Sequence, residues 1–247
     1  MEVPQGEIHI LITFNISQWR AWAPGLQTAA QWREWSQGEC RIDEGEASPD
    51  VSFLPAMQRR RLSRLARMAF AVGWPLAEGL EQLPLVFVSR HGETPRTFEI
   101  LSDLAAAQPL SPTQFSLSVH NAVIGLWSIL RGETAEMTAI AAEGDGFEHA
   151  VVEAAGLLQD GAPAVLLIVA EESPPDVYSP WIDDVPCDYA LGLLLTPGDD
   201  WCLSLDGDKA APATEPHALS WLRNLLDERS TWTHTLKDRT WNWQRKA

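Results

Sequence analysis

Residues that could carry chemistry gather in one short stretch, where Arg90-His91-Gly92-Glu93 follows the apolar run Leu83 to Ser89. A histidine in this setting can act as a nucleophile toward a phosphoryl group, while a neighbouring arginine holds the phosphate oxygens. The other five histidines are scattered through different segments: His9, His120, His149, His217 and His234. The three cysteines show neither metal-ligand spacing nor a paired framework: Cys40, Cys187 and Cys202. We therefore expect no metal site and no cofactor.

The Arg90 to Glu93 motif resembles the signature of histidine phosphatases. That family places the motif on its first strand near the N-terminus, whereas a long segment precedes it here, and no later stretch clearly supplies a second catalytic histidine. So short a match is weak evidence for a fold or an activity. We favour a structural role in which Arg90 and Glu93 fix a loop by ion pairs or hydrogen bonds. The alternative is a phosphatase-like hydrolase that uses His91 and Arg90.

The longer stretch from Phe115 to Glu172 alternates the periodicities of helices and strands. An amphipathic helix is predicted first, with six apolar positions on one face: Val119, Val123, Ile124, Trp127, Ile129 and Leu130. Four elements should follow in order, namely strand 137–142, turn 143–146, helix 147–158 and strand 164–169. The turn between a strand and a helix is where α/β folds place a nucleophile or an anion. This turn contains no nucleophile.

Asn121, Gly125, Ser128 and Ile129 resemble the Asn-x-x-x-Gly-x-x-Ser-Ile pattern of β-ketoacyl synthases of the thiolase fold. Continuing without a gap places the catalytic cysteine of that family at Gly144. Residues 161–172 are similar to the Gly-Asp-Ala-Asp strand that ends in Gly-Gly-x-Glu, although Val169 and Ala170 stand in place of the two glycines. The resemblance implies an α/β, thiolase-like fold, of which this chain is the N-terminal half, with a mixed sheet flanked by helices.

The sequence is more similar still to short, synthase-like proteins encoded with aryl polyene and related type II polyketide systems. Three motifs occur in the same order, at residues 54–63, 89–93 and 110–121. Several spaced motifs in order are more specific than any one of them. The resemblance spans roughly residues 15 to 200, and it implies a chain length factor, the inactive partner of a β-ketoacyl synthase.

A condensing synthase needs a cysteine thiolate and two histidines that come from the C-terminal half of its fold. This chain ends before that half, and Gly144 cannot form a thioester. The resemblance therefore implies a subunit that is not an enzyme and that shapes and stabilises the partner's elongation tunnel. Synthase dimers pair strand to strand near the nucleophile strand, which would be 137–142 here. The interface and tunnel candidates are His120, Asn121, Gly125, Met137, Ile140, Gly144 and Phe147.

The formal net charge of −16 argues against nucleic acid as a partner. We expect a cytoplasmic protein, because no run is long and apolar enough to span a bilayer, no signal peptide precedes the fold, and the cysteines fit a reducing compartment. Against the acidic background, Arg59, Arg60 and Arg64 stand on a predicted helix over 58–72. They are candidates for contacting an acidic acyl carrier protein, which would reach the complex through the synthase, although a solvated helix face is the favoured explanation.

The remaining segments complete a two-part prediction. Residues 1–205 should form the thiolase-like domain, beginning with a strand at 8–16 and ending with a hairpin whose strands, 188–196 and 201–205, flank the turn Pro197-Gly198-Asp199-Asp200. Residues 206–247 should form a linker, a helix over 217–228 and a Trp-rich tail. Trp19, Trp22, Trp32 and Trp35 are expected in the core rather than at an interface, and the sequence leaves open what the Trp-rich tail contacts.

Overall fold

The computed structural model describes residues 10–43, 47–206 and 215–246. Its strands are β1 (Ile10–Trp22), β2 (Leu85–Val88), β3 (Met137–Ile140), β4 (Val165–Glu171), β5 (Tyr189–Asp206), β6 (Thr231–Leu236) and β7 (Arg239–Arg245). Its helices are α1 (Ala29–Ser36), α2 (Ala56–Arg59), α3 (Arg64–Leu76), α4 (Thr94–Ala105), α5 (Pro112–Ser116), α6 (Ala122–Arg131), α7 (Gly146–Gln159) and α8 (His217–Leu226), with one 3-10 turn, η1 (Asp176–Tyr178). None of these helices is long and apolar enough to cross a membrane.

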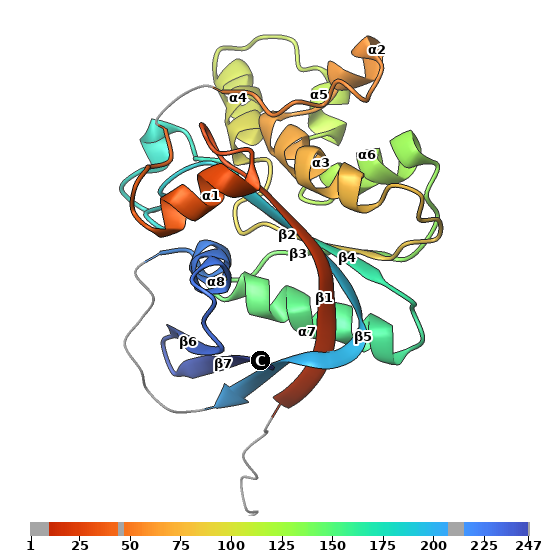
Figure 1. Cartoon of the computed structure of the whole chain (residues 1–247). Coiled ribbons are helices and arrows are strands. Elements are labelled where there is room, and N and C mark those ends of the chain that lie inside the picture. Colours follow the sequence, from red (N-terminus) through yellow and green to blue (C-terminus); the bar gives the residue numbers. More distant parts are fainter. Residues whose placement is uncertain (1–9, 44–46, 207–214, 247) are drawn as a thin grey trace, which may run out of the picture.

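All seven strands join one mixed sheet in the order β3-β2-β4-β5-β7-β6, with β1 paired to β5. Strands β3, β2 and β4 are parallel, and the other pairings are antiparallel. Helices α3 and α6 cover one face of the sheet, and α7 and α8 cover the other (Figure 1). The alternation of side chains along β2 explains the two cores, because Leu85 and Phe87 pack toward α3 while Val86 and Val88 pack toward α7.

Strand β5 connects the parallel part of the sheet to its C-terminal part. Its first half pairs with β4, its second half pairs with β7, and β1 runs along both halves. The predicted hairpin across 197–200 is therefore wrong, since these residues form a bulge within one strand between pairs Asn15–Thr196 and Phe14–Trp201. The Asn15 side chain occupies the bulge and accepts a hydrogen bond from Asp200 N at 2.9 Å. A Cβ on Gly198 would lie only 2.2 Å from that side chain.

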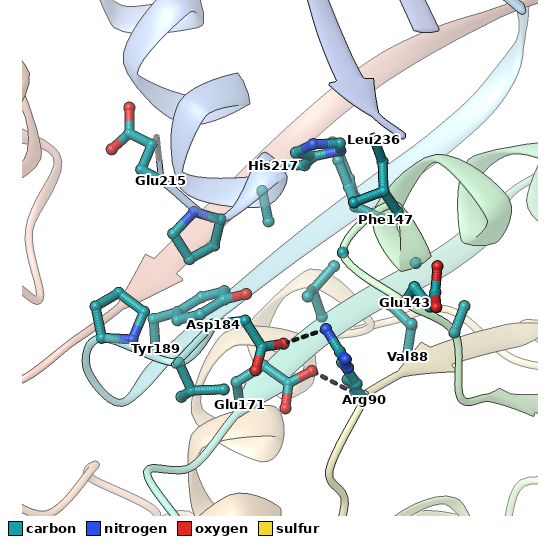
Figure 2. A pocket seen from close by; sticks show the side chains of 18 of the residues that line it. Val88, Arg90, Glu143, Phe147, Glu171, Asp184, Tyr189, Glu215, His217 and Leu236 are labelled. Carbon is teal, nitrogen blue, oxygen red and sulfur yellow. Dashed lines mark hydrogen bonds and ion pairs between the residues drawn. The ribbon is translucent and has the colours of Figure 1, made fainter. Parts of the chain in front are cut away.

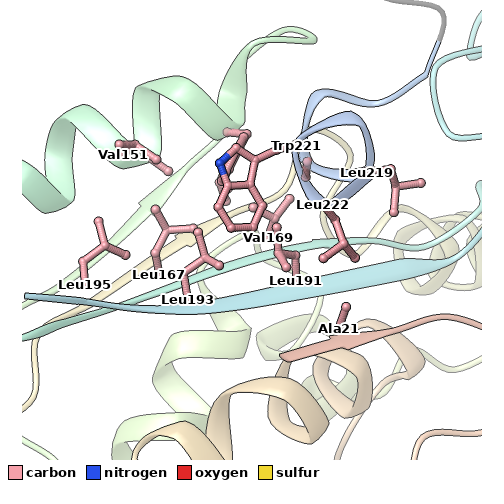
Figure 3. Close-up of a cluster of buried hydrophobic side chains, with 14 of the residues drawn as sticks. Ala21, Val151, Leu167, Val169, Leu191, Leu193, Leu195, Leu219, Trp221 and Leu222 are labelled. Atoms are coloured by element: carbon pink, nitrogen blue, oxygen red, sulfur yellow. The ribbon is translucent and has the colours of Figure 1, made fainter. Parts of the chain in front are cut away.

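The C-terminal residues 231–245 were expected as a tail, and instead form the antiparallel pair β6 and β7, which we call the C-terminal hairpin. Its tryptophans belong to the core: Trp243 stacks on Phe147 of α7, with ring centroids 5.3 Å apart. Trp221 of α8 fills the space between α7 and the sheet (Figure 3). The hairpin thus shares one sheet and one core with the rest of the fold, while the proposed division after residue 205 stays a prediction.

Two predicted helices are interrupted. The helix expected over 58–72 is split into α2 and α3, because the Ser63 side chain caps α3 by accepting a hydrogen bond from Ala66 N at 3.0 Å. The apolar pattern from residue 115 onward is divided between α5 and α6, which leaves Val119 and Ile129 exposed to solvent. The short strand β3 begins where it was predicted but is only partly buried, because it lies at the edge of the sheet.

Two helical glycines have opposite environments, which makes them a matched pair for testing the packing. A Cβ on Gly73 of α3 would lie 2.4 Å from Ile168 Cδ1 and 3.1 Å from the Trp127 ring, whereas a Cβ on Gly125 of α6 would have no atom within 4 Å. We expect Gly73→Ala to lower the free energy of unfolding by about 1–3 kcal/mol through overpacking. Gly125→Ala should raise it by about 0.5–1 kcal/mol. Urea denaturation of both variants checks this, and equal effects would contradict the close packing of α3 on β4.

Candidate functional site

The turn over residues 143–146, here named the Gly144 turn, lies at the carboxyl end of β3, on the edge of the parallel strands where open α/β sheets bind ligands. Gly144 has room for a side chain, since a Cβ there would lie 3.4 Å from Leu236 Cδ1, an ordinary contact. Gly146 is different, because a Cβ there would lie 3.1 Å from Val88 Cγ2. The glycine at 146 therefore lets α7 begin close to β2.

Acidic residues of the Gly144 turn hold the C-terminal hairpin. Lys237, at the tip of the hairpin, donates to both oxygens of Glu143 at 2.6 and 2.7 Å. The buried Asp145 carboxylate accepts from Arg239 Nε at 2.8 Å and from Trp241 Nε1 at 3.1 Å. These contacts join residues nearly a hundred positions apart and fix the hairpin above the turn.

One turn of α7 further on, Glu148 is fully buried and binds three C-terminal elements at once. Its two oxygens contact Nδ1 of His217 on α8 at 2.9 Å and Nδ1 of His234 on β6 at 2.6 Å. Trp243 Nε1 of β7 donates to the same carboxylate at 3.2 Å. Burial alone would raise the pKa of Glu148, but the two histidines together lower it to about 2. Burial likewise opposes charge on His217, yet Glu148 raises the His217 pKa above its ordinary value.

Glu148, His217 and His234 are also the one group of three potential metal ligands in the described ranges whose ligating atoms all lie within 4.8 Å. Two ligands of a tetrahedral zinc ion, each about 2.0–2.1 Å from the metal, are separated by about 3.3 Å. The nitrogen–oxygen distances of 2.6 and 2.9 Å are shorter and are those of hydrogen bonds. We therefore describe the group as a hydrogen-bonded ion network.

A cavity of about 360 Å³ opens beside the Gly144 turn, and we call it the Gly144 cavity. Its floor is formed by the ends of β2 and β4, at Val88 and Val169, and its roof by α8 and the tip of β6, including Leu236 (Figure 2). On one side Arg90 Nη1 donates to Asp184 Oδ2 at 2.7 Å. The network around Glu148 thus positions the roof of this cavity.

Glu171, the last residue of β4, lines the same cavity. Its oxygens accept hydrogen bonds from Arg90 N at 2.5 Å, from Ser89 Oγ at 3.1 Å and from His91 N at 3.5 Å. Burial, together with the negative charge of nearby Asp184, raises the pKa of Glu171 to about 7. The three hydrogen bonds act in the opposite direction and lower it. A buried carboxyl that exchanges its proton near neutral pH is therefore part of the site.

The family model described as "Beta-ketoacyl synthase, N-terminal domain" matches residues 32–244. The chain belongs to this family. A comparison with curated proteins gives no match. The strand order, the helix after the Gly144 turn and the match together confirm the thiolase-like fold of the N-terminal half of a synthase.

Among solved structures, the chain is similar to "Ketosynthase (ApeO) in Complex with its Chain Length Factor (ApeC) from Xenorhabdus doucetiae", with a TM-score of 0.85, 31% identity, and coverage of 95% of this chain and 100% of that chain. It is also similar to "The ishigamide ketosynthase/chain length factor", at a TM-score of 0.66 and 13% identity, covering 98% of this chain and 100% of that one. A β-ketoacyl synthase from Burkholderia phymatum matches with a TM-score of 0.57 and 12% identity, and the match covers 89% of this chain and 71% of that chain. The last two show the fold alone.

In this synthase-family chain, the Arg90 to Glu93 motif fixes a loop, as the favoured interpretation expected. His91 Nε2 contacts Asp184 Oδ1 at 3.0 Å, and Glu93 accepts from Ser63 Oγ at 2.6 Å. Arg90 Nη1 contacts the other oxygen of the same Asp184 carboxylate at 2.7 Å, so both side chains are engaged within the fold and are not open to a phosphate. The structure does bring His120 near the motif, but its Nε2 contacts the Ser89 carbonyl at 2.7 Å. The phosphatase alternative is not favoured.

The interface and tunnel candidates do not form one cluster. Met137 and Ile140 are partly exposed on β3, and Gly144 is partly exposed in the turn that follows. Phe147 is buried in the core and contributes to the wall of the Gly144 cavity. The other three lie at or near α6: His120 contacts Ser89, Asn121 is the residue before the helix, and Gly125 is exposed on it.

The three arginine candidates also have different environments. Arg64 forms an ion pair with Asp188 and lies over the Trp22 ring, with 5.7 Å between the guanidinium carbon and the ring centroid. Arg59 is partly buried and Arg60 is exposed. A contact with a carrier protein stays a prediction for this group, and Arg60 is its most accessible member.

Sequence reasoning missed the residues that build the site around the Gly144 turn, above all Glu148, Glu171 and His217. Each acquires its role from a partner far away in sequence, for example 69 positions for Glu148 and His217. One local signal was present: Glu148 lies between Phe147 and Val151 on the buried side of a helix, where an acidic residue needs a buried partner.

We expect Glu148→Gln to lower the free energy of unfolding by about 3–5 kcal/mol near pH 6, because His217 and His234 would lose a charged partner inside the core. A lowered carboxyl pKa stabilises the fold above its ordinary value of 4.5, and that contribution is lost as the pH falls toward 2. The raised pKa of His217 stabilises the fold fully below the ordinary 6.5, and that contribution is lost as the pH rises from 6.5 through the raised pKa. The loss of unfolding free energy in the Glu148→Gln variant should therefore be largest between the two ordinary pKa values, 4.5 for the carboxyl and 6.5 for the histidine.

Urea denaturation followed by tryptophan fluorescence at pH 4, 5.5 and 8 measures this difference. The control is Glu153→Gln on the same helix, where a partly exposed carboxylate accepts a single bond from Thr138 Oγ1 at 3.1 Å. We expect the control to cost about 1 kcal/mol or less at each pH. Equal losses for the two variants would show that the Glu148 network does not hold the C-terminal elements.

Proposed function

We propose that this chain is a non-catalytic, chain-length-factor-like partner of a β-ketoacyl synthase that elongates chains on an acyl carrier protein. The absence of a nucleophile in the Gly144 turn supports this, since the resemblance to synthases puts the catalytic cysteine at Gly144. The similarity to a ketosynthase/chain length factor complex at 31% identity supports the same role. The synthase would supply the cysteine and histidines, and this chain would shape the tunnel that holds the product.

The observation that carries the proposal is the open edge of β3. This strand ends the sheet order, and no other described strand pairs with its outer side. The carbonyls of Glu136 and Ile140 accept hydrogen bonds from β2, at Leu85 N and Ser89 N. Because backbone groups alternate sides along a strand, the N–H and C=O of Ala139 point to the open edge. An unprotected edge is a template for pairing with another chain.

Exposed apolar side chains elsewhere on the molecule support a large covering partner. Five of them lie on α4, α5 and the residues beside them: Leu101, Leu104, Leu110, Phe115 and Val119. A monomer rarely exposes so many large apolar side chains on neighbouring segments. In the proposed complex, Met137, Ile140 and Gly144 lie at the interface with the synthase, and the carrier protein docks mainly on the synthase, with Arg60 close enough to assist. The product would be an aryl polyene or a related polyketide or fatty acid.

We expect Ala139→Pro to abolish stable pairing with the synthase, because proline removes the outward N–H while leaving the bonds to β2 in place. The measurement is co-expression of the two subunits with a tag on this chain only, followed by size-exclusion chromatography and mass analysis. Ala139→Ser, which keeps the N–H, is the matched control and should form the wild-type complex. Stoichiometric recovery of the synthase with the proline variant would refute pairing through β3, and failure of the wild-type chain to bind would refute the partnership.

A second prediction tests the absence of catalysis at the Gly144 turn. Gly144→Ala fits beside Leu236 without displacing it, so the variant complex should elongate chains within about twofold of the wild-type rate. Replacing the cysteine of the synthase partner should remove elongation altogether. The assay is product formation from acyl and malonyl carrier proteins. A loss of about a hundredfold in the Gly144→Ala complex, with the complex intact, would indicate that this turn participates in the reaction.

A further inference from the structure

The Gly144 cavity contains a tyrosine hydroxyl that the fold leaves unused. Tyr189 opens β5, and its side chain is 5% exposed. Figure 2 shows the hydroxyl pointing into the cavity, and no described residue forms a hydrogen bond with it. Burial raises the pKa of Tyr189 well above its ordinary value, so the hydroxyl keeps its proton and is available as a donor. The hydroxyl is accessible from the cavity and makes no bond to the described residues, so it is free to donate to a ligand there.

Tyr189 is the direct cross-strand neighbour of Glu171 in the β4–β5 pairing. Side chains at such positions lie on the same face, with Cβ atoms about 4.5–5.5 Å apart. The oxygens of Glu171 already accept three hydrogen bonds, from Arg90, Ser89 and His91. With those positions occupied, the protonated form of Glu171 has its own O–H to offer. The two residues then present two donors to the same space.

The surroundings select a neutral ligand with an apolar body. The walls between the polar groups are apolar, from Val88, Val169, Phe147 and Leu236. Arg90 is paired with Asp184 and Glu143 with Lys237, while the exposed Asp183 adds a further negative charge at the cavity. An anion would face the carboxylates of these pairs, and it would find Arg90 already engaged. The volume of about 360 Å³ lies at the lower end of the range for small-molecule sites.

We propose that the Gly144 cavity binds a neutral small molecule through a carbonyl oxygen, which accepts hydrogen bonds from Tyr189 and Glu171 while its apolar part packs between the strand ends and Leu236. A carbonyl oxygen has two lone pairs and suits two converging donors. A tyrosine paired with a neutral carboxylic acid is one of the arrangements that proteins use to polarise a carbonyl. Gly144 borders both this cavity and the surface that would meet a synthase, but Glu171 and Tyr189 lie on β4 and β5, away from the open edge of β3. The proposal therefore does not depend on that partnership.

The proposal fixes a direction for the dependence on pH. The groups around the Glu171 carboxyl are Asp184 from the loop before β5 and, after β2, the Ser89 hydroxyl, the backbone N–H groups of Arg90 and His91, and the Arg90 guanidinium that pairs with Asp184. Tyr189 lies beside Glu171 on the neighbouring strand. Because the pKa of Glu171 is about 7, raising the pH from 6 to 8 removes the proton that it would donate. Carbonyl binding should weaken by about tenfold over this range. A cation would show the opposite dependence, since it prefers the ionised carboxylate.

The test uses the full chain, alone or co-produced with its synthase, and three probes with the same carbon skeleton: 4-phenyl-3-buten-2-one, 4-phenyl-3-buten-2-ol and 4-phenyl-3-buten-2-amine. The ketone has an absorption band that moves to longer wavelength when its carbonyl accepts hydrogen bonds. We expect the ketone to bind at pH 6 with this shift, the alcohol to bind at least about tenfold more weakly, and the amine not to bind preferentially.

Two variants separate the proposed donors from general packing. Tyr189→Phe removes a hydroxyl that has no partner among the described residues, so it should keep the melting temperature, weaken ketone binding by about tenfold and reduce the spectral shift. Glu171→Gln keeps a donor on its amide group and should retain binding while abolishing the dependence on pH. Preferential binding of the amine that strengthens with pH, affinity unchanged by Tyr189→Phe, or no binding of any probe at pH 6 would each overturn the proposal.

Discussion

The fold around the Gly144 turn depends on one buried carboxylate. Glu148 holds α8 through His217, β6 through His234 and β7 through Trp243, so a single side chain of α7 binds every C-terminal element of the described chain. An isolated charge in this position would be very costly, and the opposite charge on histidine together with the hydrogen bonds offsets that cost. Glu148 also lies in the first turn of α7, where the helix dipole favours a negative charge.

The same network determines what surrounds the turn. Once His217 and His234 are held, the tip of the hairpin lies over Gly144, with Lys237 and Arg239 paired to the acids on either side of it. Leu236 and Thr235 then become the roof of the cavity. Strand β5 supports this arrangement from below, since it pairs with β4 under the turn and with β7 under the hairpin. Residues around the Gly144 turn, in the middle of the chain, and residues of the C-terminal elements thus build the site together.

The strongest periodic segments of the sequence could be translated into structure correctly. The apolar runs that became β2 and β4, and the helix α7 after a glycine turn, have local patterns that tertiary contacts reinforce. The resemblance to synthases located Gly144 without any geometry. The alternation in Thr231–Leu236 and Arg239–Arg245, with Trp232, His234, Trp241 and Trp243 on buried positions, was also a strand signal, and the description as a tail overlooked it.

Other features could not be predicted because distant contacts override the local signal. Pro197-Gly198-Asp199-Asp200 has the composition of a turn, but Asn15 of β1 fills the bulge and keeps β5 in one line. The arginine-rich helix is divided by the Ser63 cap, whose hydroxyl also donates to Glu93 thirty residues later. The residues of the Gly144 cavity were the hardest to predict from the sequence. Glu171 and Tyr189 belong to different strands, and only their register makes them neighbours.

The surroundings of Gly144 show what the polar groups of this turn do in the fold. A nucleophile in this turn would need a base and donors for the developing charge within reach. Here the acids on either side of Gly144 form ion pairs with Lys237 and Arg239. The nearby His217 is hydrogen-bonded to Glu148. The groups that remain available, Glu171 and Tyr189, face the cavity rather than one another. The polar groups of the turn therefore stabilise the fold, through Lys237 and Arg239 of the C-terminal hairpin.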